Sequence, residues 1–369
     1  MTIDLDPEER AFRDACAKLA ADLTAHWSLG RGPADVAPPL PPPADWAKLA
    51  DAGWLGLCLR EENGGAEAGP FYASLLVTEV ARAALPAPVL GTLLAARQLE
   101  AYGADPELLA SIAAGQVRVA PLLGPDLTGF AAGTGGALAW DAAGADFAVS
   151  VPDGTARPLT AASGGADLTR AVRAALPTAP TRPPLRLHTP SQSERARVDA
   201  FALALLTADL LGVMEAAHAA AVAHAKTRTQ YGAPIGSFEA VADLAAEGKV
   251  LLEATRTATW YAAWSVDAEP PQKALHAARV AKAFASRAAV EVCEAVVQVF
   301  GGIGFTWEFP AHLWLRRAHA SRLAFGSEHH HESLLAAEAF TPSPTPPAPA
   351  QSPPALGATN LPVGSDIRS

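Results

Sequence analysis

Apolar positions recur with helical spacing over most of the chain. From Glu194 to Phe340 they fall in four or five long Ala-rich segments that are joined by short connections. Short connections between long amphipathic helices place neighbouring helices antiparallel to each other. Residues 193–340 are therefore predicted to form a C-terminal antiparallel helical bundle.

The first 118 residues also follow a helical pattern and are predicted to form an N-terminal helical domain. Pro7-Glu8-Glu9 begins one helix, with acids in the first turn where they interact favourably with the helix dipole. After a Pro-rich break over residues 38–43, a short helix begins at Asp45 and is closed by Gly53. Three apolar residues beyond that glycine are expected in the core: Trp54, Leu55 and Leu57.

Residues 119–192 differ from both helical parts, because Gly, Pro, Thr and short apolar runs dominate them. Ala137–Trp140 and Phe147–Val151 are typical of short strands, so this range is predicted to be a small β domain. The last 29 residues, 341–369, contain eight prolines and cannot form a packed core, so they are predicted to be a disordered tail. The fold class is mainly α with a small β domain.

Composition excludes several classes of protein. The formal net charge of −10 argues against sequence-independent nucleic-acid binding, which needs a basic surface. Cys16, Cys58 and Cys293 are few, odd in number and far apart, which favours reduced thiols over a disulfide framework or a zinc site. The polar, acidic start and the expected lack of an apolar run of membrane-spanning length indicate a cytoplasmic protein without a membrane partner.

Two motifs carry the candidate chemistry. Gln298–Thr306 ends a long helical pattern on a glycine pair, whose backbone N–H groups can approach a flat or phosphorylated ligand. About 70 residues earlier, Arg228–Phe238 places an arginine and a tyrosine where a helix ends. An arginine there can hold a pyrophosphate and an aromatic ring can stack on a flavin or adenine. Taken alone, Arg228 is also explained as a cation that satisfies the last helix carbonyls.

In this order and at this separation, the two motifs resemble the C-terminal domain of the acyl-CoA dehydrogenase family of flavoproteins. Residues 46–65 resemble the N-terminal domain of the same family, through Trp, Leu-Ala, Gly-Trp-Leu-Gly-Leu and Glu-x-Gly-Gly in that order. The resemblance implies three parts, an oligomer, FAD as cofactor and α,β-dehydrogenation of an acyl-CoA thioester. The family's flavin-contacting Thr-Glu-Pro-x-Ala-Gly-Ser-like segment has only a poor counterpart in Leu122–Gly129, so the β domain is expected to be abbreviated.

The resemblance also assigns cofactor-binding residues. In the family, residues that match the two motifs bind the ADP half of the FAD held by the neighbouring subunit, and a Gly-Thr pair holds the flavin. At Glu239 the family usually has Gln, and a carboxylate close to a pyrophosphate is repulsive. The positions that match are Arg228, Tyr231, Phe238, Gln298, Gly301 and Gly302 for the ADP half, with Gly326 and Ser327 for the flavin.

The catalytic base of the family is a Glu that removes the α proton while the β-hydride goes to the flavin, and neither of its usual positions holds a Glu here. Phe325 occupies the commoner position and Ala202 the other. Glu328, one turn beyond Phe325, is the candidate that remains, although it is also explained as an acid at a helix start. His329–His331 cannot converge on one metal ion, because consecutive helical residues point about 100° apart, so they are interpreted as surface or flavin-edge residues and no metal site is expected.

Three arginines follow the glycine loop on a predicted helix: Arg316, Arg317 and Arg322. We interpret them as a solvated or interface face that forms salt bridges, with contact to a CoA or flavin phosphate as the alternative.

The missing Glu implies a second chain. Some actinobacterial members of the family that act on CoA thioesters of steroid side chains are α2β2 assemblies, in which one chain carries the base and the other completes the flavin site. The chain is expected to be such a subunit, with an acyl-CoA dehydrogenase-like partner that supplies the Glu, or otherwise a homo-oligomer. Two alternatives stay open: a flavoprotein of a biosynthetic pathway acting on a carrier-bound acyl group, and a non-catalytic structural or binding subunit.

Overall fold

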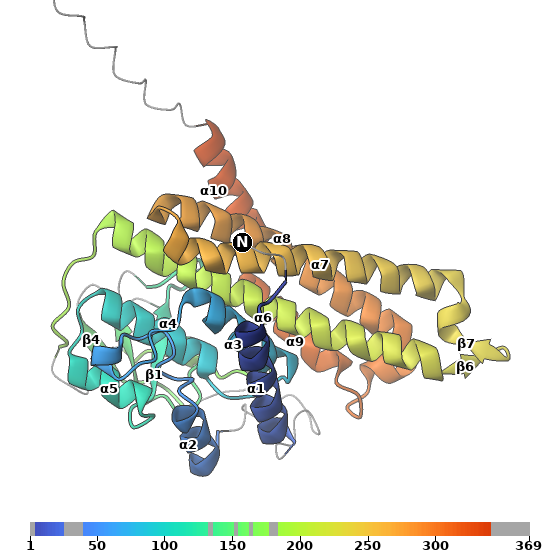
Figure 1. Cartoon of the computed structure of the whole chain (residues 1–369), viewed down its shortest axis with the longest axis horizontal. Coiled ribbons are helices and arrows are strands. Elements are labelled where there is room, and N and C mark those ends of the chain that lie inside the picture. The colour runs from blue at the N-terminus through green and yellow to red at the C-terminus, as the bar shows by residue number, and fades with distance from the viewer. Residues whose placement is uncertain are drawn as a thin grey trace, which may run out of the picture.

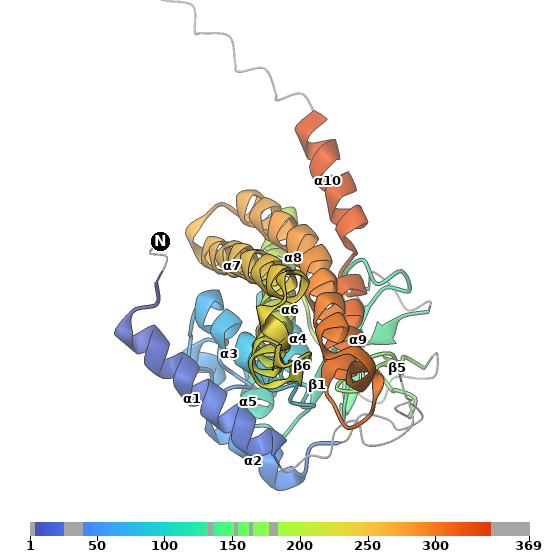
Figure 2. The same cartoon turned by 90° about the vertical axis from the view of Figure 1, so that its right-hand side faces the viewer.

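The computed structural model describes residues 4–25, 40–131, 136–150, 154–161, 165–176 and 184–340. The predicted tail, 341–369, lies outside the described residues, and the Pro-rich break is described only from residue 40. Helices make up most of the described chain, together with a five-stranded sheet and a two-stranded hairpin (Figures 1 and 2). The predicted fold class is confirmed, while the boundaries between the three parts stay a prediction.

The N-terminal part is helical, and its first helix begins at Pro7, as predicted. Asp6 and Glu9 form a reciprocal capping box at the start of the first helix, and each satisfies a backbone N–H group of the other residue. The three apolar residues after Gly53 are buried, as predicted. The helices are α1 (Pro7–Thr24), α2 (Pro43–Asp51), α3 (Pro70–Arg82), α4 (Val89–Ala101) and α5 (Pro106–Ala113), with a 3-10 turn η1 (Glu61–Asn63).

A five-stranded sheet follows, in the order β4-β3-β1-β2-β5. Both predicted strand regions are confirmed, as β2 and β3, and the sequence reading missed the central strand β1, which is buried along its whole length. β1 pairs with β3 in parallel and with β2 antiparallel. The strands are β1 (Val119–Leu123), β2 (Leu138–Ala139), β3 (Phe147–Ser150), β4 (Thr155–Arg157) and β5 (Arg173–Ala174).

The C-terminal part is the predicted bundle. Three long helices run along one another, and two shorter helices pack against them (Figure 2). A two-stranded hairpin and a 3-10 turn connect the first two long helices at the far end of the bundle (Figure 1). The elements are α6 (Gln192–Thr227), β6 (Thr229–Gln230), β7 (Ala233–Pro234), η2 (Ile235–Ser237), α7 (Glu239–Ala268), α8 (Pro271–Phe300), η3 (Gly301–Phe305), α9 (Ala311–Leu323) and α10 (Glu328–Phe340).

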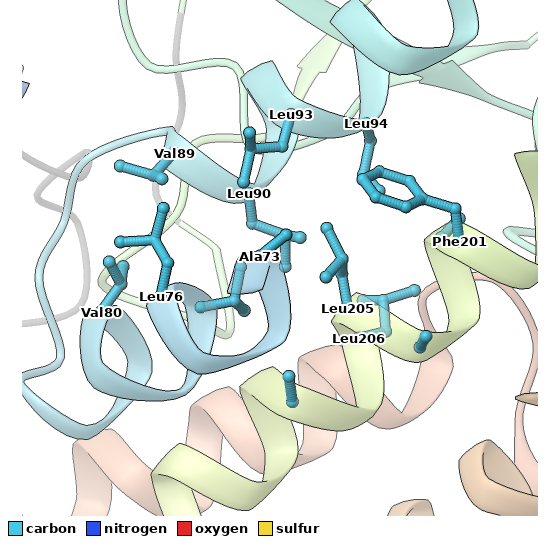
Figure 3. Packing of buried hydrophobic residues seen from close by; sticks show 14 of the residues in the cluster. Ala73, Leu76, Val80, Val89, Leu90, Leu93, Leu94, Phe201, Leu205 and Leu206 are labelled. Atoms are coloured by element: carbon cyan, nitrogen blue, oxygen red, sulfur yellow. The ribbon is translucent and has the colours of Figure 1, made fainter. Parts of the chain in front are cut away.

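α6 is the central element of the molecule. Every residue from 200 to 214 is buried, because α3 and α4 cover one side of the helix and the bundle covers the other (Figure 3). A helix that is apolar on all sides is stable only in such surroundings. The closest approach is at Gly212, where a Cβ atom would lie 2.1 Å from the carbonyl oxygen of Thr78 on α3. Glycine is therefore required at this crossing.

Two helices are long and apolar enough, by length and composition alone, to cross a membrane: α6 and the stretch from α8 into η3. The sequence-based expectation that no apolar segment reaches this length was therefore wrong. In α6, 89% of the apolar window is buried inside the protein, which is the behaviour of a core helix.

A buried cluster of charges joins the sheet region to the bundle. Asp209 of α6 accepts hydrogen bonds from Arg170, which precedes β5, at 2.5 and 3.1 Å, and from Arg317 of α9 at 2.6 and 3.2 Å. The hydroxyl of Ser321 donates a further bond of 2.7 Å to the same carboxylate. Burial would raise the pKa of Asp209, but the two guanidiniums outweigh it and hold the pKa well below its usual range. Arg317 therefore belongs to the core, and its interpretation as part of a solvated or interface face was wrong.

Candidate active site and cofactor-binding surface

The residues assigned to the ADP half of FAD lie at one end of the bundle. α6 and α8 both end there, and the rings of His224 and Phe300, one from each helix, are 4.5 Å apart between centroids. Gly301 ends α8 with a φ of +61°, a positive value that favours glycine. The two motifs that are 70 residues apart in the sequence are thus brought together by the antiparallel packing of the helices.

This end of the bundle presents an open surface with free polar groups. Arg228 is the exposed C-cap of α6, and its guanidinium makes no hydrogen bond or ion pair with any residue that the structure describes. Tyr231 is 97% exposed, and its ring meets that of Phe238 edge-to-face at 6.3 Å. A Cβ atom added to Gly301 or Gly302 would contact nothing within 4 Å. A cation, exposed aromatic rings and uncovered backbone are the groups that a nucleotide diphosphate needs.

Gly326 and Ser327 do not belong to this surface. α9 separates them from the glycine loop, and its 13 residues span about 20 Å. The N–H group of Gly326 donates to the carbonyl of Leu127 beside the sheet, at 3.0 Å, and the Gly326 carbonyl accepts from the buried Lys282 at 2.9 Å. Burial lowers the pKa of Lys282 to about 7. The loop is thus held between the sheet region and the bundle.

A cavity of about 390 Å³ lies beside this loop. Its walls come from α4, from the segment after β1, from α6, from α8 and from the segment that contains α10. Apolar and aromatic side chains share the wall with a comparable number of polar and charged ones, so the cavity can take a ligand that has both an apolar and a polar part. The residues that line it include Gln98, Tyr102, Phe130, Asp199, Leu203, Leu275, Arg279, Phe325 and His331.

Both positions at which the resemblance expects a Glu lie at or next to the cavity, and both hold apolar residues. Phe325 lines the cavity, has a φ of +57°, and packs its ring edge-to-face against Phe130 at 4.8 Å. Ala202 is fully buried on α6, next to the cavity-lining Leu203. A non-glycine residue with positive φ is strained backbone, and Phe325 keeps this conformation because the loop is bound on both sides.

Glu328 does not line the cavity. It is 3% exposed and forms a two-point ion pair with Arg322, whose Nε donates to Oε2 at 2.7 Å. Burial would raise the pKa of Glu328, but the hydrogen bonds from Arg322 outweigh it and the pKa is lowered. A catalytic base that must take up a proton needs a raised pKa, so the geometry argues against this role for Glu328.

We expect Glu328→Gln to affect stability and not proton transfer. Loss of a partly buried, charge-assisted pair should lower the free energy of unfolding by about 1–2 kcal/mol. The pH profile of dehydrogenase turnover by the assembled protein should keep its shape. Urea denaturation measures the loss of stability, and a pH series of acceptor reduction measures the profile. A profile that loses its acidic limb in the variant, the rise of activity with pH as a base ionises, would contradict the expectation.

The three consecutive histidines have different surroundings. His329 is exposed, whereas His331 is 2% exposed and lines the cavity. Nε2 of His331 hydrogen-bonds the carbonyl of Phe325 at 2.9 Å, so this nitrogen carries the hydrogen. Burial is the main cause that lowers the pKa of His331 to about 3, and the ring is therefore neutral. Of the two interpretations of the triplet, surface or flavin-edge residues, the first is wrong for His331 and the second stays a prediction.

Sequence reasoning missed Asp199, an acid that lines the cavity. It lies on α6 three residues before Ala202, and therefore on the same face of the helix. The signal was present in the sequence, as a carboxylate one turn away from a position where the family places its base. No periodicity argument distinguishes it from the neighbouring charges at the start of α6.

Comparison with known proteins shows the family. Residues 203–340 match the model of the acyl-CoA dehydrogenase C-terminal domain, and residues 6–109 match that of the N-terminal domain. Acyl-CoA dehydrogenase IpdE2 of Mycobacterium tuberculosis is 31% identical over 285 residues, 75% of this chain and 80% of that protein. Acyl-CoA dehydrogenase FadE34 of the same organism is 32% identical over 334 residues, 84% of this chain. The chain spans only 43% of the length of FadE34.

Solved structures share the fold. The ChsE4–ChsE5 complex from Mycobacterium tuberculosis has a chain with a TM-score of 0.74 at 22% identity, over 93% of this chain and 100% of that chain. A variant of the Tcur3481–Tcur3483 steroid acyl-CoA dehydrogenase gives a TM-score of 0.70 at 22% identity, over 89% of this chain and 97% of that chain.

Proposed function

The chain belongs to the acyl-CoA dehydrogenase family of oxidoreductases, and on that premise we propose that it takes part in the FAD-dependent α,β-dehydrogenation of an acyl-CoA thioester. The observation that carries the proposal is the cavity between the sheet region and the bundle. Its wall contains Phe325, the residue that stands where the family commonly has its catalytic Glu. The apolar part of its wall, which includes Leu203, Leu275 and Phe325, suits an acyl chain.

FAD is the cofactor that we propose, and when bound it would accept the hydride from Cβ. The surface at the end of the bundle fits its ADP half, because Arg228 has no partner among the described residues and the glycine pair is uncovered. Arg228 would hold the pyrophosphate, the neighbouring aromatic rings would stack on the adenine, and Gln298 with the backbone of Gly301 and Gly302 would complete the contact. Gly326 and Ser327 would contact the flavin.

These two sets of residues lie on different parts of one chain, which supports a cofactor shared between subunits. The end of the bundle would serve the FAD of a neighbouring subunit, and the loop at Gly326 would serve the cavity of its own chain. Glu239, the exposed first residue of α7, adds a negative charge close to the end of the bundle and should weaken the hold on a pyrophosphate.

The unlike partner is the second element of the proposal. Phe325 and Ala202 leave the usual base positions without a carboxylate, and Glu328 is held ionised by Arg322. We propose an α2β2 assembly in which an acyl-CoA dehydrogenase-like partner supplies the catalytic Glu. A chain of the ChsE4–ChsE5 complex shares the fold. The match to this chain covers 43% of FadE34, so the rest of that protein is long enough for a second unit of similar length. A steroid side-chain thioester as substrate, and the cytoplasm as location, belong to the same proposal.

The test is co-expression of this chain with the acyl-CoA dehydrogenase-like chain encoded beside it. We expect a stable yellow complex that reduces an artificial electron acceptor when an acyl-CoA is added. Replacement of the partner's Glu by Gln should lower the turnover of the complex by roughly 10²- to 10⁴-fold, because a general base contributes about that factor. Turnover that does not change in that variant, or a purified complex that holds no flavin, would refute the proposal.

A further inference from the structure

The cavity contains one carboxylate among the residues that the structure describes, and this group has no hydrogen-bond or ion-pair partner among them. Asp199 is the acid that lines it. Its carboxylate makes no hydrogen bond or ion pair with the described residues, although two guanidiniums are nearby. Arg195 donates to the carbonyl of Pro190 at 2.6 Å, and Arg279 pairs with Glu338. A half-buried acid that is left unpaired in this way is costly to keep, and such groups cluster at functional sites.

The position of Asp199 suits a group that acts on a bound thioester. It lies one helical turn before Ala202 and shares a face of α6 with Leu203, which also lines the cavity. Phe325, at the other family position of the base, lies in the wall of the same cavity. Asp199 therefore opens onto a cavity whose wall contains one of the positions at which family members place their carboxylate, and it lies one helical turn from the other.

We propose that Asp199 is a general base in this chain's own cavity and reversibly removes the α proton of a bound acyl-CoA thioester. The inference rests on the proposed function for the class of ligand, but it does not need the partner's Glu. The assembly would then have two kinds of proton-abstracting site, one with the partner's Glu and one with Asp199 of this chain.

The proton step balances without an oxidant. The Cα–H bond of the thioester breaks, the proton goes to a carboxylate oxygen of Asp199, and the electron pair moves onto the thioester carbonyl as an enolate. Arg279 and Arg195 are cations that stabilise the negative oxygen. Return of a proton from solvent through Asp199 restores the thioester, so the net result is exchange of the α hydrogen.

The electrostatics of the cavity place the pKa of this acid near neutrality. Burial raises the pKa of Asp199 to about 6, and Arg279 and Arg195 oppose the rise. A base with this pKa is ionised at pH 7 and still takes up a proton readily. The charged and titratable groups that face the cavity from the surrounding elements are Arg195 on α6, Arg279 on α8, Tyr102 at the end of α4, and His330 and His331 on α10.

The experiment measures α-proton exchange with a probe that cannot be oxidised. In a 3-thiaoctanoyl-CoA, sulfur replaces the β-carbon, so no β-hydride is available and only proton transfer occurs. The full-length protein, in the assembly in which it purifies and with any partner's Glu replaced by Gln, is incubated with this probe in D2O. Mass spectrometry then follows deuterium at Cα. We expect exchange whose rate rises with pH through about 6 and then levels off, because the ionised carboxylate is the active form.

Asp199→Asn should lower this exchange rate by roughly 10²-fold or more and remove the rise near pH 6, and Asp199→Glu should restore part of it. Asp267→Asn is the matched control, because burial also raises the pKa of Asp267 and that residue lines a different cavity. The Asp267→Asn protein should exchange the α hydrogen of the probe at the wild-type rate. Exchange that persists in Asp199→Asn, or that is absent from the wild-type protein, overturns the inference. Acceptor reduction by the complex, measured separately, reports on the proposed dehydrogenation.

Discussion

Asp209→Ala should lower the free energy of unfolding by about 3–5 kcal/mol, the largest loss that we expect from any single substitution in this chain. The carboxylate accepts bonds from two buried guanidiniums and a hydroxyl. When one partner of a buried ion pair is removed, the other is left as an uncompensated charge, and losses of this size result. Asp141 and Asp167, which lie 3.8 and 3.7 Å from Arg170, compensate only in part.

Urea denaturation at pH 7 measures this loss, with Glu332→Gln as the control. Glu332 pairs with Arg287 at the surface, and exposed pairs contribute about 0–1 kcal/mol. The pKa of Asp209 is depressed in the folded protein, so its contribution is present above the unfolded pKa of about 4 and is lost as the pH falls below it. The difference in the free energy of unfolding between wild type and Asp209→Ala should therefore become smaller at acidic pH. Equal losses in both variants would show that the cluster is not a stabilising element.

Arg228→Ala should weaken FAD binding by the assembled protein by roughly 10- to 100-fold. The physical reason is the loss of a charge-assisted contact to the pyrophosphate, worth on the order of 1.5–3 kcal/mol. Because Arg228 makes no hydrogen bond or ion pair within the described part of the chain, the substitution should leave the free energy of unfolding of the flavin-free protein nearly unchanged. A loss of cofactor without a loss of stability is the signature of a binding residue.

Titration of the flavin-free assembly with FAD, followed by flavin fluorescence, gives the dissociation constant directly. Arg60→Ala is the control, since Arg60 is a similarly exposed arginine on the N-terminal part. It should bind FAD as the wild type does. If Arg228→Ala and Gln298→Ala both bind FAD with wild-type affinity, the end of the bundle is not the cofactor surface.

Local features of the fold could be predicted because their causes are local. Asp6 and Glu9 cap α1 through residues three positions apart, and Gly301 ends α8 because glycine adopts its backbone angle at low cost. Strand β1 escaped prediction for a related reason. Pro121 interrupts its apolar run, and a proline argues against a central strand. The segment is a strand because it pairs with β3 and β2, and both of these strands come later in the chain.

Arg317 and His331 show where local reasoning fails. Both stand in helical segments with polar neighbours. Arg317 was interpreted as part of a solvated or interface face, and His331 as a surface or flavin-edge residue. Arg317 is buried because Asp209, more than 100 residues earlier, meets it at the crossing of α9 and α6. His331 is buried because the Gly326 loop folds back over it and offers the carbonyl of Phe325. The burial of a charge depends on its partner, and the partner is set by the packing of helices.

The sequence by itself determined the family, the helical bundle, the glycine and arginine motifs, and the loss of Glu from its usual positions, since each of these is a property of residue type and spacing. Only the tertiary structure decided that the residues proposed to bind the cofactor divide between two surfaces, that Glu328 is bound to Arg322, and that Asp199 opens onto the cavity without a hydrogen bond or ion pair among the described residues. The physical reason is distance along the chain. The walls of the cavity come from helices and loops more than 200 residues apart, and only the packing of α6 against the rest brings them to one place.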